Sequence, residues 1–114
     1  MATPERIAVI RNTGTPAGIA TAGMLEFFNR HDTEKYATLG GPLHDPCTIA
    51  WLLQPELFTG KTCNISIETR SELTLGHTAV DFWNVTSKHK NENWLYAVNA
   101  DGFFTLLTER LARL

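Results

Sequence analysis

The stretch Gly40-Gly41-Pro42-Leu43-His44-Asp45-Pro46 joins two helical patterns and sets how the chain continues. Aspartate is a good N-cap residue and proline suits the first helical position, so Asp45-Pro46 indicates a helix start. Cys47 to Leu53 continues it as an apolar helix. A glycine-rich loop that runs into a helix N-terminus gathers backbone N–H groups and a partial positive charge at one point. We therefore expect this loop to hold His44 and Asp45 firmly.

These two polar residues can be interpreted in two ways. A histidine can donate or accept a proton near neutral pH, and aspartate is a hard oxygen ligand that suits calcium or magnesium. If the backbone is extended there, His44 and Asp45 point to opposite sides and would serve two different subsites. The simpler interpretation is that Asp45 only caps the helix and His44 is an ordinary loop histidine. The local pattern leaves both interpretations open.

Two further helix starts precede the loop. Thr3-Pro4-Glu5 and Thr15-Pro16 each place a capping threonine before a proline. The first helix is predicted to end near Asn12-Thr13-Gly14. The second is longer and has one broad apolar face, and Asn29 to Asp32 is expected to end or bend it. His31 is expected at the surface.

After the loop helix, which Gln54-Pro55 should terminate, the pattern changes to strands. Lys61 to Thr69 alternates apolar and polar residues, which predicts a strand with one buried face. Gly76 to Trp83 and Trp94 to Val98 indicate two more strands, and the first two strands should form an antiparallel hairpin.

A final amphipathic helix, capped by Asn99 or Asp101, completes the prediction. Its packing stripe should contain Phe103, Phe104, Leu107, Leu111 and Leu114. The expected fold class is α/β, of the α+β fragment type. It comprises two N-terminal helices, the motif loop and its helix, a three-stranded and largely antiparallel sheet, and a C-terminal helix. At 114 residues the chain is expected to be a single domain at most.

Composition excludes several classes of partner. The net charge of -2, without a compensating Lys/Arg cluster, predicts no binding to nucleic acid. No apolar run is long enough to span a membrane, and the N-terminus lacks a signal-peptide pattern. Cys47 and Cys63 share no metal-like or redox spacing, so we expect reduced thiols in a cytoplasmic protein.

The run from Gly41 to Cys47, with Ala50 and Leu52-Leu53 after it, resembles the C-terminal motif of the nucleoside hydrolases, the inosine-uridine preferring N-ribohydrolases. The resemblance extends upstream to Thr3 and covers nearly the whole chain. Downstream it continues through Pro55-Glu56-Leu57-Phe58, Ile67-Glu68-Thr69, Glu72-Leu73-Thr74, Gly76, Thr78, Val80 and Asp81. It implies the C-terminal third or so of an enzyme that cleaves the N-glycosidic bond of ribonucleosides.

The resemblance also implies roles for three residues. In that family the motif's histidine protonates the departing base, which matches His44, and the aspartate after it is a calcium ligand, which matches Asp45. An aromatic residue eight positions before the histidine contributes to the nucleoside pocket in some members, and Tyr36 occupies that position. An aromatic ring that merely packs at a helix end is the other interpretation of Tyr36.

The sequence also departs from the family pattern. The family's other calcium aspartates lie in a DxDxxxDD-like run near the N-terminus, and no such run occurs here. The aspartates of this chain, Asp32, Asp45, Asp81 and Asp101, are isolated from one another. Calcium typically takes about six to eight oxygen ligands. We therefore expect this chain alone to bind no calcium and to hydrolyse nucleosides very slowly at most.

Three hypotheses follow. The chain is the C-terminal piece of an N-ribohydrolase that acts on a nucleoside only when a partner supplies the N-terminal half. Alternatively, it is a non-catalytic domain that has kept a weak nucleoside-binding pocket. In the third hypothesis it is an interaction module, whose uncovered surface makes a homo-oligomer.

Overall fold

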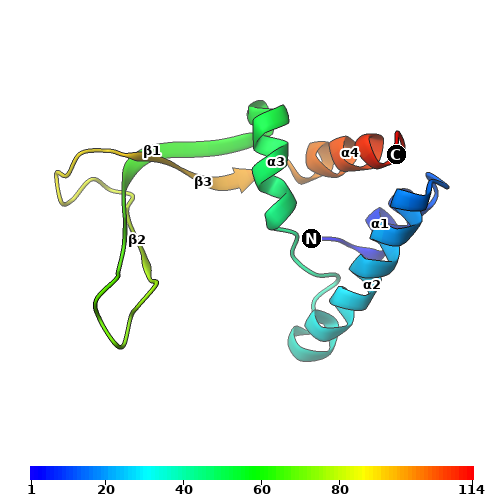
Figure 1. Cartoon of the computed structure of the whole chain (residues 1–114), viewed down its shortest axis with the longest axis horizontal. Helices are drawn as coiled ribbons and strands as arrows, with labels where there is room; N and C mark the ends of the chain where they lie inside the picture. Colours follow the sequence, from blue (N-terminus) through cyan, green and yellow to red (C-terminus); the bar gives the residue numbers. More distant parts are fainter. The chain divides into compact units, whose positions relative to one another are not determined.

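The computed structural model describes residues 1–114 except for the side chain of Asp32, and it divides into two compact units (Figure 1). The first unit comprises residues 1–57 and 99–114, and the second comprises residues 58–98. Helices of the first unit are α1 (Pro4–Arg11), α2 (Pro16–Tyr36), α3 (Asp45–Leu53) and α4 (Ala100–Leu111), with a 3-10 turn, η1 (Pro55–Leu57). Strands of the second unit are β1 (Phe58–Ile67), β2 (Thr78–Asp81) and β3 (Glu92–Val98). The predicted order and types of element are confirmed.

The predicted threonine caps are present in the first unit. Thr3 accepts a hydrogen bond from the Arg6 amide at 3.4 Å, which starts α1. Thr15 accepts from the Gly18 amide at 3.1 Å and donates its hydroxyl to the Leu111 carbonyl at 2.9 Å. This one side chain therefore starts α2 and also ties it to the end of α4.

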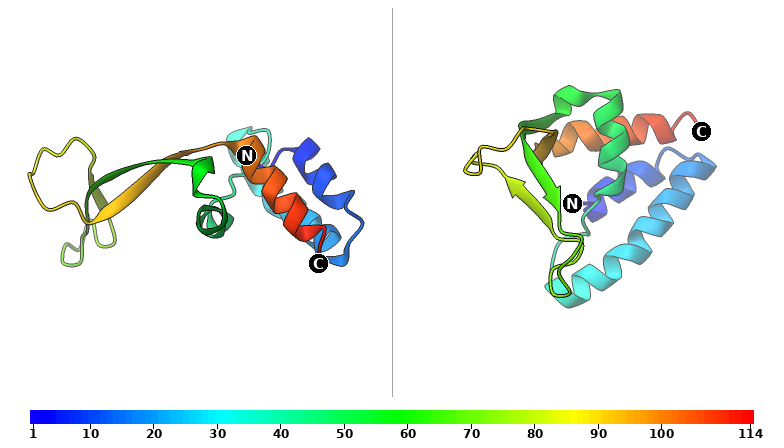
Figure 2. Two further views of the ribbon diagram at one scale, coloured as in Figure 1. Left: turned by 90° about the horizontal axis from the view of Figure 1, so that it is seen from above. Right: turned by 60° about the vertical axis from the view of Figure 1, so that its left-hand side comes forward.

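Helices α1, α2 and α4 form the packed part of the first unit, and Figure 2 shows α4 alongside α1. Its buried apolar side chains come from all three helices: Ile7, Ile10, Ala22, Leu25, Phe103, Phe104 and Leu106. Arg6 reinforces the α1–α4 contact, because its guanidinium lies 2.6 Å from the Asp101 carboxylate and 4.6 Å from the Phe104 ring centre. Leu114, which the sequence placed in the packing stripe, is exposed.

Helix α2 runs through the point where the sequence indicated an end or a bend. Asn29 is buried in the middle of the helix. Its side-chain amide donates to the Ala2 carbonyl at 2.7 Å and its side-chain oxygen accepts from the Gly41 amide at 2.8 Å. These two tertiary hydrogen bonds offset the poor helix propensity of asparagine, so the helix continues to Tyr36.

The second unit is a three-stranded antiparallel sheet in the order β2-β1-β3, which confirms the predicted sheet. Strand β1 starts earlier than the pattern indicated, at Phe58, because Phe58 pairs with Val98 before a register shift between Thr59 and Gly60. Cys63 is fully buried, whereas Ile67 is exposed, so the predicted buried face is only partly formed.

Candidate functional site

The motif loop is anchored at its two glycines. Gly40 has a φ of +98°, and a Cβ on it would lie 2.3 Å from the Ala2 carbonyl oxygen, so glycine is required there. The Ala2 amide donates to the Gly41 carbonyl at 2.8 Å, and the Gly41 amide donates to the Asn29 side chain. The start of the loop is therefore fixed both to the N-terminal segment and to α2.

At the other end of the loop, the helix start differs from the prediction by one residue. His44 occupies the N-cap position and its side chain makes no capping hydrogen bond, whereas Asp45 is already helical. The predicted N-cap role of Asp45 is therefore wrong. The backbone at His44 has φ −96° and ψ −51°, which is not extended. The condition for His44 and Asp45 to point to opposite sides is therefore not met.

The side chain of Cys47, in the first turn of α3, is hydrogen-bonded to the preceding loop. The Cys47 thiol donates to the Leu43 carbonyl at 3.3 Å, and burial raises the pKa of this thiol. Cys47 is therefore a packing residue that fixes the first turn of α3. Both Cys47 and Cys63 are free thiols.

The two candidate residues line one hollow of about 330 Å³. His44 and Asp45 are exposed in it. The rest of its lining is apolar: Met24, Leu25 and Phe28 from α2, Pro42 and Leu43 from the loop, and Pro46 from α3. The structure thus brings an imidazole and a carboxylate together against an apolar wall. Such a site suits a small ligand with an apolar face and a polar edge.

The third candidate residue lies elsewhere on α2. Tyr36 is 59% exposed, and the Lys35 ammonium lies 5.1 Å from its ring centre. Among the described residues, those that line the hollow do not include Tyr36. The structure therefore brings His44 and Asp45 together without Tyr36.

Sequence reasoning did not assign a site role to the wall of the hollow. Met24 and Phe28 belong to the broad apolar face predicted for the second helix, and their spacing of four residues puts them on the same side. Asn29 was interpreted as a helix-ending residue, yet it positions the loop that carries His44. The signal that could have found Asn29 was an amide inside an otherwise strong helical pattern.

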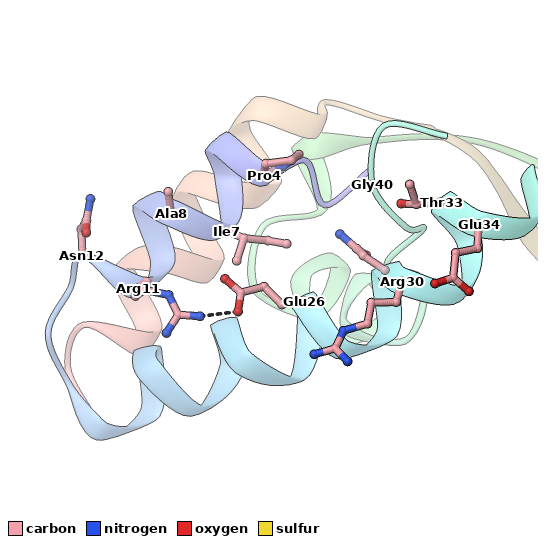
Figure 3. Close-up of a pocket in the computed structure, with 11 residues that line it drawn as sticks. Pro4, Ile7, Ala8, Arg11, Asn12, Glu26, Arg30, Thr33, Glu34 and Gly40 are labelled. Atoms are coloured by element: carbon pink, nitrogen blue, oxygen red, sulfur yellow. Dashed lines mark ion pairs between the residues drawn. The ribbon is translucent and has the colours of Figure 1, made fainter. Parts of the chain in front are cut away.

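A second hollow, of about 430 Å³, lies between α1 and α2 (Figure 3). Arg11 and Glu26 point toward one another in it and form an ion pair of 2.6 Å. The Arg30 guanidinium lies 5.6 Å from the Phe27 ring centre. None of the three candidate site residues lines this hollow, so we do not assign the site to it.

The described residues do not fit a calcium site on their own. No group of three or more His, Cys, Asp or Glu that could hold a metal occurs among them. The Asp81 carboxylate accepts hydrogen bonds from the loop that follows it, and Asp101 pairs with Arg6. The side chain of Asp32 lies outside the described residues. Asp45 is the one carboxylate among the described residues that line the same hollow as His44, and one carboxylate falls far below the number of oxygen ligands that calcium takes.

Among the described residues, no helix combines the length and the apolar character needed to cross a lipid bilayer.

Comparison with known proteins agrees with the sequence motif. The family model for "Inosine-uridine preferring nucleoside hydrolase" matches residues 1–105. The pyrimidine-specific ribonucleoside hydrolase RihA of Shewanella oneidensis is 49% identical over 109 residues, which are 95% of this chain and 33% of that protein. The chain thus spans about a third of the length of the curated relatives it matches.

Solved structures show the same fold. A purine-preferring ribonucleoside hydrolase from Gardnerella vaginalis superposes with a TM-score of 0.76 at 25% identity, over 96% of this chain and 35% of that one. A plant nucleoside hydrolase, PpNRh1, superposes with a TM-score of 0.78 at 20% identity, over 96% of this chain and 36% of that one. The chain belongs to the inosine-uridine preferring nucleoside hydrolase family.

Proposed function

We propose that this chain is the C-terminal part of an enzyme that hydrolyses the N-glycosidic bond of ribonucleosides, and that it acts only when the rest of the fold completes the site. Family membership supports the reaction class. The observation that carries the proposal is that His44 and Asp45 line one hollow of about 330 Å³ against an apolar wall.

His44 is the proposed general acid. Breaking an N-ribosidic bond develops positive charge on the ribose and negative charge on the departing base, so a proton delivered to the base lowers the barrier. The exposed imidazole can reach a base seated in the hollow, and Phe28 offers that base an aromatic neighbour. One positioned acid contributes roughly a hundredfold to ten-thousandfold in rate.

Asp45 is the proposed calcium ligand from this chain. The other ligands would come from the part of the enzyme that this chain does not span. A bound calcium ion would hold the attacking water and the ribose hydroxyls. Tyr36 stays a predicted nucleoside contact, on the same helix as the wall of the hollow. A partner that supplies the N-terminal half, self-association and a cytoplasmic location also stay predictions.

A chimera tests the proposal. In Shewanella oneidensis RihA, the matched third is replaced by this chain, which covers 33% of that protein. We expect the chimera to hydrolyse pyrimidine ribonucleosides. The substitution His44→Ala should lower kcat by roughly 100-fold to 10,000-fold, while nucleoside affinity, measured by calorimetry, is retained.

The matched control is His31→Ala, because His31 is an exposed histidine on α2 and does not line the hollow. This variant should keep the kcat of the parent chimera. Unchanged turnover in the His44→Ala chimera would overturn the assignment of the acid. A correctly folded chimera without any hydrolysis of pyrimidine or purine ribonucleosides would overturn the proposed reaction.

A further inference from the structure

The α1–α2 hollow, the space of about 430 Å³ between those two helices, is separate from the candidate site and has a different chemical character (Figure 3). Helix α1 supplies its apolar lining, which comprises Pro4, Ile7 and Ala8. Two guanidinium groups and two carboxylates also line it, those of Arg11, Arg30, Glu26 and Glu34. An apolar surface beside a few polar groups is the usual composition of a small-molecule site.

The charges of the α1–α2 hollow are only partly paired. Arg11 and Glu26 neutralise each other through their ion pair of 2.6 Å. Among the described residues, no carboxylate lies within ion-pair distance of the Arg30 guanidinium, and Figure 3 shows the Arg30 side chain directed away from Glu34. An arginine followed four residues later by a glutamate is the weaker order for such a pair on a helix. The Arg30 guanidinium is therefore available to a ligand.

A buried hydrogen-bond donor borders the same hollow. Asn29 lines it and is only 9% exposed. A side-chain amide has two N–H groups, and one of those on Asn29 donates to the Ala2 carbonyl. Within the part of the chain that the structure describes, the other N–H has no acceptor. A buried N–H without an acceptor is costly, so an oxygen atom of a ligand would be favourable there.

We propose that the α1–α2 hollow binds a small organic carboxylate with an apolar body. The Arg30 guanidinium can hold a carboxylate through two parallel N–H···O bonds, and the apolar lining from α1 contacts the body of the ligand. A singly charged carboxylate fits better than a doubly charged phosphate. The reason is that the Glu26 and Glu34 carboxylates repel each further negative charge.

The α1–α2 hollow also borders the anchor of the motif loop. Asn29 and Gly40 line the hollow, and Asn29 accepts the hydrogen bond from the Gly41 amide. A ligand that binds only the closed anchor stabilises it against local opening. Bound carboxylate should therefore slow hydrogen exchange at the Gly41 amide. An effect on His44 rests on the proposed function, whereas the binding itself does not.

A titration of the isolated chain with benzoate, followed by NMR, tests the binding. Benzoate should give saturable shifts of the Ile7, Ala8 and Asn29 amides with a Kd of roughly 1 mM. Benzyl alcohol, which has the same ring without the charge, should bind at least roughly tenfold more weakly.

Three variants assign the contacts. Arg30→Gln should weaken benzoate binding by roughly tenfold. Its matched control is Lys35→Gln, which removes a positive charge from the same helix outside the hollow and should change the affinity by less than about twofold. Glu26→Gln frees the Arg11 guanidinium and removes a repelling carboxylate, so it should tighten binding by roughly threefold.

Several outcomes would overturn the proposal. Equal benzoate affinity of the parent chain and Arg30→Gln would show that Arg30 does not hold the carboxylate, and the absence of shifts up to roughly 20 mM benzoate would show that there is no site. Tighter binding of phenyl phosphate than of benzoate would contradict the assigned ligand class. Unchanged exchange at the Gly41 amide in the benzoate complex would refute the link to the motif loop. None of these measurements uses nucleoside hydrolysis, so an inactive chimera would overturn the proposed function and leave the carboxylate site standing.

Discussion

Replacing Asn29 by alanine would remove the side chain that holds the motif loop to helix α2. Its amide group makes two hydrogen bonds, to the Ala2 carbonyl at 2.7 Å and from the Gly41 amide at 2.8 Å. Ala2 and Gly41 are both buried. Without the side chain, a buried carbonyl loses a donor and a buried N–H group loses its acceptor.

The magnitude follows from these two groups. A buried polar group left without a partner costs about 1–3 kcal/mol, and partial rehydration through the small cavity reduces the cost. For Asn29→Ala we therefore expect a loss of about 2–4 kcal/mol in the free energy of unfolding. This is a large part of the roughly 5–15 kcal/mol that stabilises an ordinary domain.

Urea unfolding followed by circular dichroism measures the loss, and amide hydrogen exchange at Gly41 locates it. His31→Ala is the matched control, because His31 is exposed on the same helix, and it should change the stability by less than about 0.5 kcal/mol. A loss below about 1 kcal/mol in Asn29→Ala, with the Gly41 amide still protected from exchange, would refute the reasoning.

Three further predictions concern the loop, the sheet and the metal. Gly40→Ala should destabilise the protein by at least about 3 kcal/mol, because the new Cβ would clash with the Ala2 carbonyl. Gly14→Ala is the control: Gly14 has a φ of +71° but open space around it, so the substitution should cost only about 1 kcal/mol. Equal losses of stability in thermal unfolding of the two variants would contradict this prediction. Hydrogen bonds from the Thr86 hydroxyl and from the backbone amides of Thr86 and Val85 lower the pKa of the Asp81 carboxyl. They therefore stabilise the loop above the ordinary aspartate pKa of about 3.9, and this stability is lost as the pH falls further. Amide exchange at Thr86, corrected for its intrinsic rate, should therefore stay constant from pH 6 to about pH 4 and accelerate at lower pH, and constant protection down to about pH 2 would show that Asp81 does not hold the loop. Calorimetry of the isolated chain with millimolar calcium should give no saturable heat, and a tight one-to-one isotherm would show that a calcium site had been missed.

Short-range signals predicted the helix starts well. Thr3, Thr15 and Asn99 each cap a helix by accepting a hydrogen bond from the amide three residues on, and this interaction depends on local sequence alone. The same logic predicts the helix after the motif loop, but its N-cap residue is His44 instead of the predicted Asp45. Proline at the second helical position is compatible with either start, so local sequence could not decide between them.

Features that depend on distant residues were not predictable in the same way. Strand β1 begins at Phe58 because β3 offers it a partner, Val98, beyond the register shift between Thr59 and Gly60. Helix α2 passes Asn29 because Ala2 and Gly41 satisfy its amide. These partners, strand β3, Ala2 and Gly41, lie too far along the chain for a pattern within one helix or strand to reveal them. The exposure of Ile49, Leu52 and Leu53 on α3 is a further difference, since a helix that is apolar on most sides is expected to be buried.

In the proposed enzyme, the preferred base should depend on residues other than the apolar wall of the hollow. Relatives named as pyrimidine-specific and as purine-preferring share this third of the fold, so the fold itself does not discriminate between bases. A site that rejects the wrong base strongly does so with polar groups that the wrong base leaves unpaired. The side chains of Leu25, Phe28 and Pro42 in the wall carry no hydrogen-bonding group. In the proposed enzyme they contribute contact area to either kind of base, His44 protonates either kind, and discrimination falls to polar side chains from the two thirds that this chain does not span.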